Sequence, residues 1–325
     1  MRKGFVFGKF MPFHKGHEAM INFALTVCDE LTVLVCCSNK EEMPASLRVS
    51  WVEETFAGNR KINVQLLEYD ESLLPNTSVT SATISALWAE KFKELLPGHK
   101  VLVTSEPYGN LVADFMGIEH IPFNIGRDLV PVAASKIRED YKAYWNFLPA
   151  SVKKHYITKV VLLGTESTGK TTLTSRLAAH FNAGAVLEAG RDLIADSNEF
   201  TLDDLYAVAR AHADAINRAS VADKPLVFID TDIYITLSYG EFAFNEVLEI
   251  DDEIFTANKA TLYLYLNNDV PYFQDGTRLS EADRNQLDFS HRWILEKYGV
   301  RYEEISGNWD ERFEQAVKLV NELAR

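Results

Sequence analysis

The sequence lacks a long apolar run, a basic surplus and a cysteine framework, and each absence excludes a class of protein. No stretch approaches the roughly 18 consecutive apolar residues of a transmembrane helix, so we expect no membrane partner. The net charge of −14 argues against a broad nucleic-acid surface, so we expect no nucleic acid partner. The three cysteines, Cys28, Cys36 and Cys37, lack the spacing of a zinc site or a disulfide framework, which predicts a reducing, cytoplasmic location.

What is present is a globular composition of sufficient length for two domains. The chain has 325 residues, of which 47% are hydrophobic and 25% charged. The N-terminal MRKGFVFGKF has neither the apolar core nor the small-residue cleavage site of a signal peptide. In so acidic a chain, the few basic residues beside glycine-rich loops are candidates for binding anionic substrates.

The clearest motif lies at the middle of the chain, from Val160 to Leu173. Val160–Leu163 is an apolar strand pattern, the loop that follows fits G-x-x-x-x-G-K-[ST], and a helical apolar spacing comes after it. In this context backbone N–H groups and a helix N-terminus converge on phosphate oxygens, which disfavours the alternative of a glycine-rich turn that binds nothing. Lys170 is the candidate for the β- and γ-phosphates of ATP and Thr171 for Mg²⁺. The candidate nucleotide-binding residues of the loop are Gly164, Glu166, Ser167, Thr168, Gly169, Lys170, Thr171 and Thr172.

Two acidic clusters follow later strands of the second half. Asp230 comes directly after the apolar run Leu226–Ile229, at the position of a Walker B aspartate that contacts Mg²⁺; a helix cap is the alternative for Asp230. A short strand at 185–187 ends in Glu188, with Arg191 nearby. Glu188 or Asp232 could orient or deprotonate an acceptor hydroxyl, and the sequence does not choose between them.

The first strand, Lys3–Phe7, ends in a second glycine loop. It carries Gly8, Lys9, Phe10, His14, Gly16 and His17, and a helical pattern follows. Imidazoles at a loop-to-helix junction would donate hydrogen bonds to phosphate oxygens. A metal site is the competing interpretation, but no third ligand cluster accompanies the histidines; two surface histidines on a turn would leave the flanking glycines unexplained.

The G-x-F-x-P-x-H-x-G-H pattern resembles the nucleotidylyltransferase superfamily. The resemblance implies a doubly wound parallel sheet and a second signature near the end of the domain. Val132–Arg138 fits that signature imperfectly: Arg138 and Ser135 are in place, whereas Ala133 replaces a serine. A similar stretch at 80–85 lacks the arginine and is better interpreted as a helix cap. Strand patterns at 31–37, 62–67, 100–104 and 118–121 give the rhythm of a parallel α/β sheet.

The chain as a whole resembles the NadR family of bifunctional nicotinamide mononucleotide (NMN) adenylyltransferases and ribosylnicotinamide kinases. The segments that carry the resemblance include GKFMPFHKGH, TSEPYG, VAASKIRED, GTESTGKTT, FIDTD and QDGTR, in family order. It implies two α/β domains, a Rossmann-like nucleotidylyltransferase at 1–150 and a P-loop kinase at 151–325, without the helix-turn-helix repressor domain of some members.

The same resemblance assigns further roles. It implies Mg²⁺ as cofactor, ATP as substrate of both sites, and ribosylnicotinamide, NMN and NAD as the other small molecules. It assigns Arg48 and Trp88 to the NMN side, where Trp88 would stack on nicotinamide; a core position is the alternative for Trp88. Arg278, with Arg284 as the weaker candidate, would lie in a lid over ATP. Because Leu187 replaces a residue that is aromatic in some members, Tyr234 or Tyr206 would stack on nicotinamide in the kinase.

Two other functions fit the same signatures. The chain could join another nucleotidylyltransferase, such as one for pantetheine phosphate, to an unrelated nucleoside kinase, and the nucleoside that gives ADP would discriminate. It could instead be a regulatory protein that senses NAD or ATP through one vestigial site, which tight NAD binding without pyrophosphate release would favour. Whether the chain forms a homo-oligomer is left open by the sequence.

Overall fold

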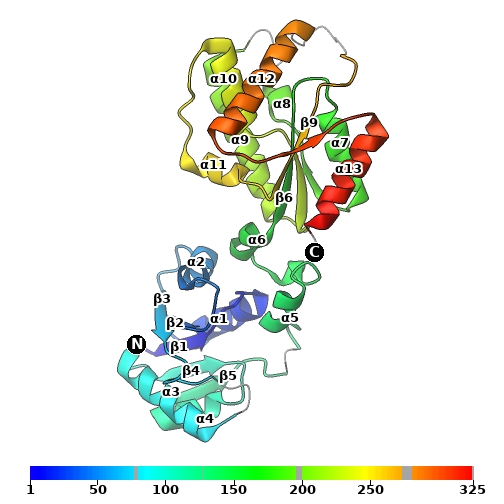
Figure 1. The fold of residues 1–325 in the computed structure, drawn as a ribbon. Helices are drawn as coiled ribbons and strands as arrows, with labels where there is room; N and C mark the ends of the chain where they lie inside the picture. Colours follow the sequence, from blue (N-terminus) through cyan, green and yellow to red (C-terminus); the bar gives the residue numbers. More distant parts are fainter. Residues whose placement is uncertain (77–79, 127, 195–199, 273–279, 324–325) are drawn as a thin grey trace. The chain divides into compact units, whose positions relative to one another are not determined.

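The computed structural model describes residues 1–76, 80–126, 128–194, 200–272 and 280–323, with only the backbone of residues 191 and 192. Its contacts divide the chain into two compact units, Met1–His155 and Tyr156–Arg325 (Figure 1). The boundary predicted at 150/151 falls at the start of helix α6 (Ala150–Tyr156). Most of α6 belongs to the first unit, because Ser151 is 2.7 Å from the Thr55 hydroxyl and Lys154 pairs with Glu54.

The first unit contains a sheet of five parallel strands in the order β3-β2-β1-β4-β5. The strands are β1 (Lys3–Gly8), β2 (Glu30–Ser38), β3 (Ile62–Tyr69), β4 (Val101–Thr104) and β5 (Glu119–Pro122). The helices are α1 (Lys15–Val27), α2 (Ala45–Thr55), α3 (Ala82–Leu95), α4 (Gly109–Met116), α5 (Ala134–Glu139) and α6, with a 3₁₀ turn at Trp145–Phe147. Since β1 lies between β2 and β4, the strand order reverses beside it, which places a crevice at its carboxyl end.

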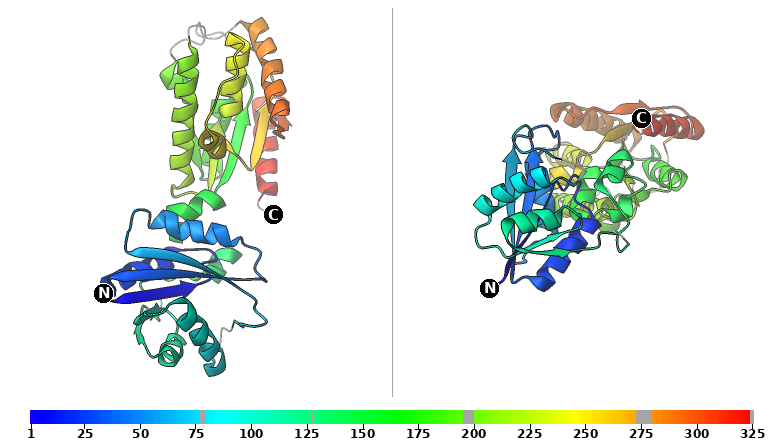
Figure 2. Two further views of the ribbon diagram at one scale, coloured as in Figure 1. Left: turned by 90° about the vertical axis from the view of Figure 1, so that its left-hand side faces the viewer. Right: turned by 90° about the horizontal axis from the view of Figure 1, so that it is seen from below.

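Apolar strands covered on both faces hold this sheet together. In β2 every residue after Glu30 is buried, as expected for a central parallel strand. Figure 2 shows α3 and α4 on one face of the sheet and α2 on the other. On the α3–α4 face, Phe92 and Ala89 pack against Phe5, Leu34 and Leu102 of the strands. Cys28, Cys36 and Cys37 are buried free thiols, and burial raises the pKa of each.

The second unit is also a five-stranded parallel sheet, in the order β10-β9-β6-β8-β7. Its strands are β6 (Thr158–Leu163), β7 (Gly184–Val186), β8 (Leu226–Asp230), β9 (Leu262–Leu266) and β10 (Glu303–Ile305). Its helices are α7 (Lys170–His180), α8 (Gly190–Leu193), α9 (Leu202–Ser220), α10 (Ile233–Phe244), α11 (Asp252–Asn258), α12 (Glu281–Lys297) and α13 (Trp309–Glu322). Central β6 therefore delivers the glycine loop to the middle of the sheet.

Two apolar layers enclose this sheet. Leu173 and Leu177 of α7 and Ala316 of α13 pack against β6, β8 and β9 on one side, and a separate cluster joins α9, α10, α11 and α12. Helix α9 begins with a capping box in which Thr201 and Asp204 satisfy each other's backbone N–H groups. Its buried stripe runs Leu205, Val208, Ala209, His212, Ala213, Ile216 and Ser220.

The predicted fold class is confirmed: both halves are parallel α/β sheets, and every strand expected from the sequence is present within one or two residues of its predicted ends. The apolar spacing of residues 309–323 predicts an amphipathic C-terminal helix, and α13 lies there. Strand β10, only three residues long, was not predicted. Within the described residues, no helix combines the length and apolarity needed to cross a membrane.

Candidate functional sites

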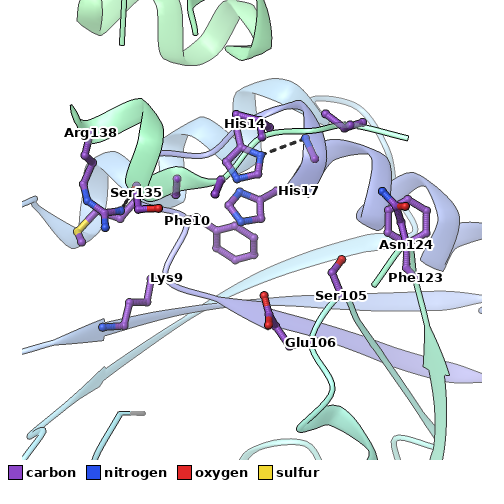
Figure 3. Close-up of a pocket in the computed structure, with 16 residues that line it drawn as sticks. Lys9, Phe10, His14, His17, Ser105, Glu106, Phe123, Asn124, Ser135 and Arg138 are labelled. Atoms are coloured by element: carbon purple, nitrogen blue, oxygen red, sulfur yellow. Dashed lines mark hydrogen bonds between the residues drawn. The ribbon is translucent and has the colours of Figure 1, made fainter. Parts of the chain in front are cut away.

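A pocket of about 310 Å³ lies at the carboxyl end of β1 (Figure 3). It brings together most of the residues predicted from the two signatures of the first half. Its lining includes Lys9, Phe10, His14, Gly16, His17, Ser105, Glu106, Val132, Ala133, Ser135 and Arg138. The GKFMPFHKGH loop and the VAASKIR segment, more than 100 residues apart in the chain, therefore form one site.

The two histidines are stacked at the start of α1. Their ring centroids are 3.7 Å apart with an interplanar angle of 21°, and Figure 3 shows them one above the other, with Phe10 beneath His17. His14 is the N-cap of α1, and its Nδ1 accepts a hydrogen bond from the Gly16 N–H at 3.1 Å. The neutral His14 ring therefore carries its proton on Nε2, which can donate to a phosphate oxygen. A Cβ on Gly16 would lie 2.9 Å from His14 Cε1, so this arrangement requires glycine.

Lys9 is held at the edge of the pocket by a buried acidic partner. Its Nζ lies 2.7 Å from Glu41 Oε1, while the other oxygen of Glu41 pairs with Arg48 at 2.5 Å. Burial alone would raise the pKa of Glu41, but the hydrogen bonds and charges of Lys9 and Arg48 lower it overall. Arg48 is itself buried and also donates to the Lys9 and Met43 carbonyls. Arg48 does not line this pocket or the second pocket described below. It contacts the Lys9 loop through its bond to the Lys9 carbonyl.

Arg138 and Ser135 lie on the short helix α5. Both are exposed, and Arg138 donates to the Met11 carbonyl at 2.5 Å, which ties α5 to the first glycine loop. Ala133 is the N-cap of α5 and provides no side-chain cap bond, as expected from the missing serine. The stretch at 80–85 behaves as predicted: Ser81 caps α3 by accepting from the Ile84 N–H.

A second pocket, of about 600 Å³, adjoins the first and shares Lys9 and Glu106 with it. Trp88 lines this pocket and is also packed in the core, with only 8% of its surface exposed. The indole lies 5.1 Å from Tyr69 and 6.2 Å from Phe7, and its N–H donates to the Pro75 carbonyl. The indole therefore belongs to the core and also faces a cavity, and its stacking on nicotinamide stays a prediction.

The pocket contains further aromatic groups that were not among the candidate site residues predicted from the sequence. Tyr69 and Tyr108 line it beside Trp88, and burial raises the pKa of Tyr69 to about 12 and that of Tyr108 further. Both phenols therefore stay neutral at physiological pH. Glu106 adds a carboxylate where the two pockets meet. The sequence signals these three residues only by their places: Tyr69 ends one strand, and Glu106 and Tyr108 follow another.

The glycine loop of the second unit has the backbone of a phosphate-binding loop. Gly164 and Gly169 have φ angles of +135° and +87°, and Ser167 has +59°. Lys170 is buried and folds back over the loop, where Nζ donates to the Gly164 and Thr165 carbonyls at 2.8 and 3.0 Å. The Thr168 hydroxyl closes the loop by donating to Thr165 O at 2.8 Å, whereas Thr172 is exposed at the start of α7. A phosphate in the loop would offer the Lys170 ammonium a charged acceptor in place of these carbonyls.

Thr171 and Asp230 meet at the predicted metal position. The Thr171 hydroxyl donates to Asp230 Oδ2 at 2.5 Å, and Asp230 is fully buried. A hydroxyl and one carboxylate fit Mg²⁺, which takes few protein ligands and completes its shell with water and phosphate. No cluster of three or more metal-binding His, Cys, Asp or Glu side chains occurs in the described part of the chain.

The two candidate carboxylates for the acceptor hydroxyl differ in environment. Asp232 is buried and caps α10, accepting from the Tyr234 and Ile235 N–H groups at 2.9 and 3.3 Å. Burial raises the pKa of Asp232 to about 7, although these two bonds oppose the shift. The cap considered for Asp230 is thus provided by Asp232. Glu188 is half-buried and lies between the end of β7 and Ala189, the N-cap of α8.

Four further residues predicted from the sequence lie elsewhere in the second unit or outside the described side chains. Arg278 lies outside the described residues, and Arg191 is described only as part of the α8 backbone. Tyr234 packs among Phe255, Tyr263 and Tyr298, and the Tyr206 hydroxyl accepts from the Glu249 N–H.

Two buried arginines contact the glycine loop, and the sequence predicted a functional role for only one of them, Arg284. Arg284 lies near the loop, with Nε 3.4 Å from the Thr165 hydroxyl and Nη2 donating to the Asn268 carbonyl. Arg312, which sequence reasoning missed, donates to the Thr168, Asn267 and Gly307 carbonyls. Their signal in the sequence is weak, since each is one charged residue on an amphipathic helix.

Known proteins resemble this chain in sequence and in fold. The AAA domain family model matches residues 159–312, which span the glycine loop and most of the second unit. The trifunctional NAD biosynthesis/regulator protein NadR of Escherichia coli is 28% identical over 98% of this chain and 83% of its own length. NadR of Salmonella typhimurium matches equally, at 28% identity with the same coverage.

A solved structure of NadR in complex with NR gives a TM-score of 0.69 at 22% identity, covering 99% of this chain and 95% of that one. The structure of NadR with NAD and AMP-PNP gives 0.65, also at 22% identity and with the same coverage. At this identity the structures show a common fold. The chain is thus similar to NadR in sequence and in fold over nearly its whole length.

Proposed function

We propose that this chain is a bifunctional transferase that makes NAD in two steps. The second unit phosphorylates ribosylnicotinamide with ATP to NMN, and the first unit adenylylates NMN with a second ATP to NAD and pyrophosphate. The observation that carries the proposal is that each unit brings together its own set of residues suited to bind phosphate, along a chain that resembles NadR throughout.

In the kinase step the 5′-hydroxyl of ribosylnicotinamide attacks the γ-phosphorus of ATP. A new O–P bond forms, the bond to the ADP oxygen breaks, and Glu188 takes the hydroxyl proton. Lys170 turns from the Gly164 and Thr165 carbonyls to the phosphates. Thr171 and Asp230 would hold Mg²⁺, which supplies charge neutralisation on the β- and γ-phosphates. Arg278 is proposed to stabilise the charge of the transferring phosphoryl group.

In the adenylyl transfer a phosphate oxygen of NMN attacks the α-phosphorus of ATP and pyrophosphate leaves. No nucleophile of the protein is needed, so catalysis consists of orientation and charge stabilisation. His14, His17, Lys9 and Arg138 converge on one pocket for ATP. The neighbouring aromatic pocket, with Trp88, Tyr69 and Tyr108, suits the cationic pyridinium ring of NMN. The shared Lys9 lies where two phosphates would approach each other.

One incubation tests both steps. Ribosylnicotinamide, ATP and Mg²⁺ are mixed with the protein, and NMN, NAD, ADP and pyrophosphate are quantified over time. We expect NMN and ADP to appear first and NAD and pyrophosphate to follow. Release of ADP only with a different nucleoside, or tight NAD binding without pyrophosphate release, would contradict the proposed function.

A further inference from the structure

The turn between β8 and α10 contains a backbone conformation that its residue type disfavours. Thr231 lies between Asp230 and Asp232 and has a φ angle of +67°, in the left-handed region. Left-handed φ is rare for β-branched residues, because their Cβ substituents crowd the neighbouring carbonyl oxygen. Such a conformation persists only where surrounding groups hold it.

The strained residue separates two carboxylates with different tasks. Before it, Asp230 ends β8 and accepts the Thr171 hydroxyl at 2.5 Å. After it, Asp232 turns back to cap α10 through the Tyr234 and Ile235 N–H groups. The left-handed step at Thr231 lets the chain leave the strand and enter the helix within one residue, so the direction of the Asp230 carboxylate depends on the shape of this turn.

One side chain from another helix holds the turn. His212 of α9 is 97% buried, and its Nε2 lies 3.2 Å from the Thr231 carbonyl. A carbonyl oxygen only accepts, so His212 carries its proton on Nε2 and donates it. Within the described residues Nδ1 has no hydrogen-bond partner, so the bond to Thr231 is the one that orients the ring.

The other contacts of the turn do not replace this one. The Thr231 N–H donates to Leu162 of β6 at 2.9 Å, as part of the strand ladder before the left-handed step. Asn258 accepts from the Ile233 N–H at 3.1 Å and therefore braces only the start of α10. The Thr231 carbonyl itself accepts its hydrogen bond from His212.

Resting on the proposed kinase function, we propose that His212 is a positioning residue: by fixing the left-handed Thr231 carbonyl, it aims the Asp230 carboxylate at Thr171 and the metal position. His212 itself contacts the backbone of the turn. It acts through the Thr231 backbone, and its contribution therefore depends on the strain at that residue.

That dependence gives a specific test, in which glycine replaces Thr231. Glycine adopts a positive φ without steric cost, so the turn should keep its shape without the histidine. We expect His212→Leu to lower kinase kcat about 10- to 100-fold, because small displacements of a catalytic group have effects of this size. The variant should also need more Mg²⁺ for half-maximal rate, with little change in the KM for ribosylnicotinamide. The double variant His212→Leu with Thr231→Gly should regain the turnover of Thr231→Gly alone, to within about 3-fold.

Conservative and matched controls complete the experiment. His212→Gln keeps an N–H donor and should stay near the wild-type rate; His212→Met serves as the second apolar variant if the leucine variant does not fold. Ser220→Ala removes another buried polar group from the same stripe of α9, whose hydroxyl donates within the helix, and should leave turnover unchanged. Hydrogen exchange is a readout independent of activity. The amides of residues 231–235 should exchange faster in His212→Leu than in the wild type, and more slowly in the double variant with Thr231→Gly than in His212→Leu.

Three results would overturn the inference: unchanged turnover and Mg²⁺ dependence in His212→Leu, equal loss with and without glycine at position 231, or equal loss in His212→Gln. A wild-type protein that does not phosphorylate ribosylnicotinamide would instead contradict the proposed function.

Discussion

The Thr171 hydroxyl donates a 2.5 Å hydrogen bond to the Asp230 carboxylate, which joins the phosphate-binding loop to the end of β8. The two residues come from motifs separated by 59 positions in the sequence. Parallel strands bring them together because β6 and β8 are neighbours whose carboxyl ends share one edge of the sheet.

We expect Thr171→Ala to lower kinase turnover by about 10²-fold or more, because a group that positions charge at the transferring phosphate is lost. Thr171→Ser keeps the hydroxyl and should retain most of the activity. Ser175→Ala, at an exposed position of the same helix, is the matched control and should behave as wild type. The measurement is ADP release against ribosylnicotinamide over a range of Mg²⁺ concentrations; equal rates for the alanine and serine variants would remove Thr171 from the site.

Trp88→Ala should raise the KM for NMN by about 5- to 150-fold, the equivalent of the 1–3 kcal/mol lost with a stacking aromatic group, while the KM for ATP changes little. Because Trp88 also belongs to the core, the variant should unfold at a lower temperature. Phe92→Leu separates the two effects, since Phe92 is a fully buried member of the same core that does not line the pocket. It should lower the melting temperature and leave the KM for NMN unchanged. An equal rise in KM in both variants would indicate a core role alone.

Glu188→Gln should lower kinase turnover far more than Asp232→Asn. Asp232 already accepts two backbone N–H groups as the cap of α10, and asparagine provides the same acceptor oxygen. Glu188 is the carboxylate proposed to take the hydroxyl proton. Single-turnover phosphorylation of ribosylnicotinamide compares the two variants directly, and a larger loss in Asp232→Asn would reverse the assignment.

The stability of the second unit should fall in acid partly through His291. Burial, assisted by the nearby Lys170 charge, lowers the pKa of His291 from 6.5 to about 3, because the cationic ring is disfavoured in the folded protein. Since the folded pKa lies below the unfolded one, this stabilisation is complete above pH 6.5 and is lost as the pH falls toward 3. In His291→Gln the free energy of unfolding should therefore depend less steeply on pH between 6 and 4, by up to about 1.4 kcal/mol per pH unit. Urea titrations across this range give the slopes, and parallel slopes in the two proteins would refute the prediction.

The parts that were predictable from the sequence are those with local signals. Apolar runs ending in glycine-rich or acidic segments identified β1, β6 and β8 with the loops that follow them, and Trp309–Leu323 showed the apolar spacing of α13. The helix cap at Ser81 also has a local signal, because Ser81 accepts from the Ile84 N–H three residues later. These features depend on near neighbours in the chain, which a pattern in the sequence records.

The parts that were not predictable depend on contacts between distant segments. Arg48 donates to the Lys9 carbonyl 39 positions before it, and this contact forms only when α2 packs beside the loop that follows β1. His212 is one polar residue in an apolar helical stripe, and its bond to Thr231 appears only once α9 packs beside β8. Asp230 and Asp232 are two residues apart, yet on either side of the left-handed Thr231 one carboxylate meets the Thr171 hydroxyl and the other caps α10.

The most direct measurement of the division between two sites separates the two reactions by mutation. Lys170→Ala should abolish NMN formation from ribosylnicotinamide while conversion of supplied NMN to NAD continues, and His17→Ala should do the reverse. Each change removes a phosphate-binding group from one unit only, a loss of about 10²-fold or more in rate. Mixing the two variants should restore NAD synthesis from ribosylnicotinamide, because NMN diffuses from one molecule to the other. If either variant, still folded, lost both reactions and the mixture stayed inactive, the chain would contain one composite site and the assignment of one reaction to each unit would be wrong.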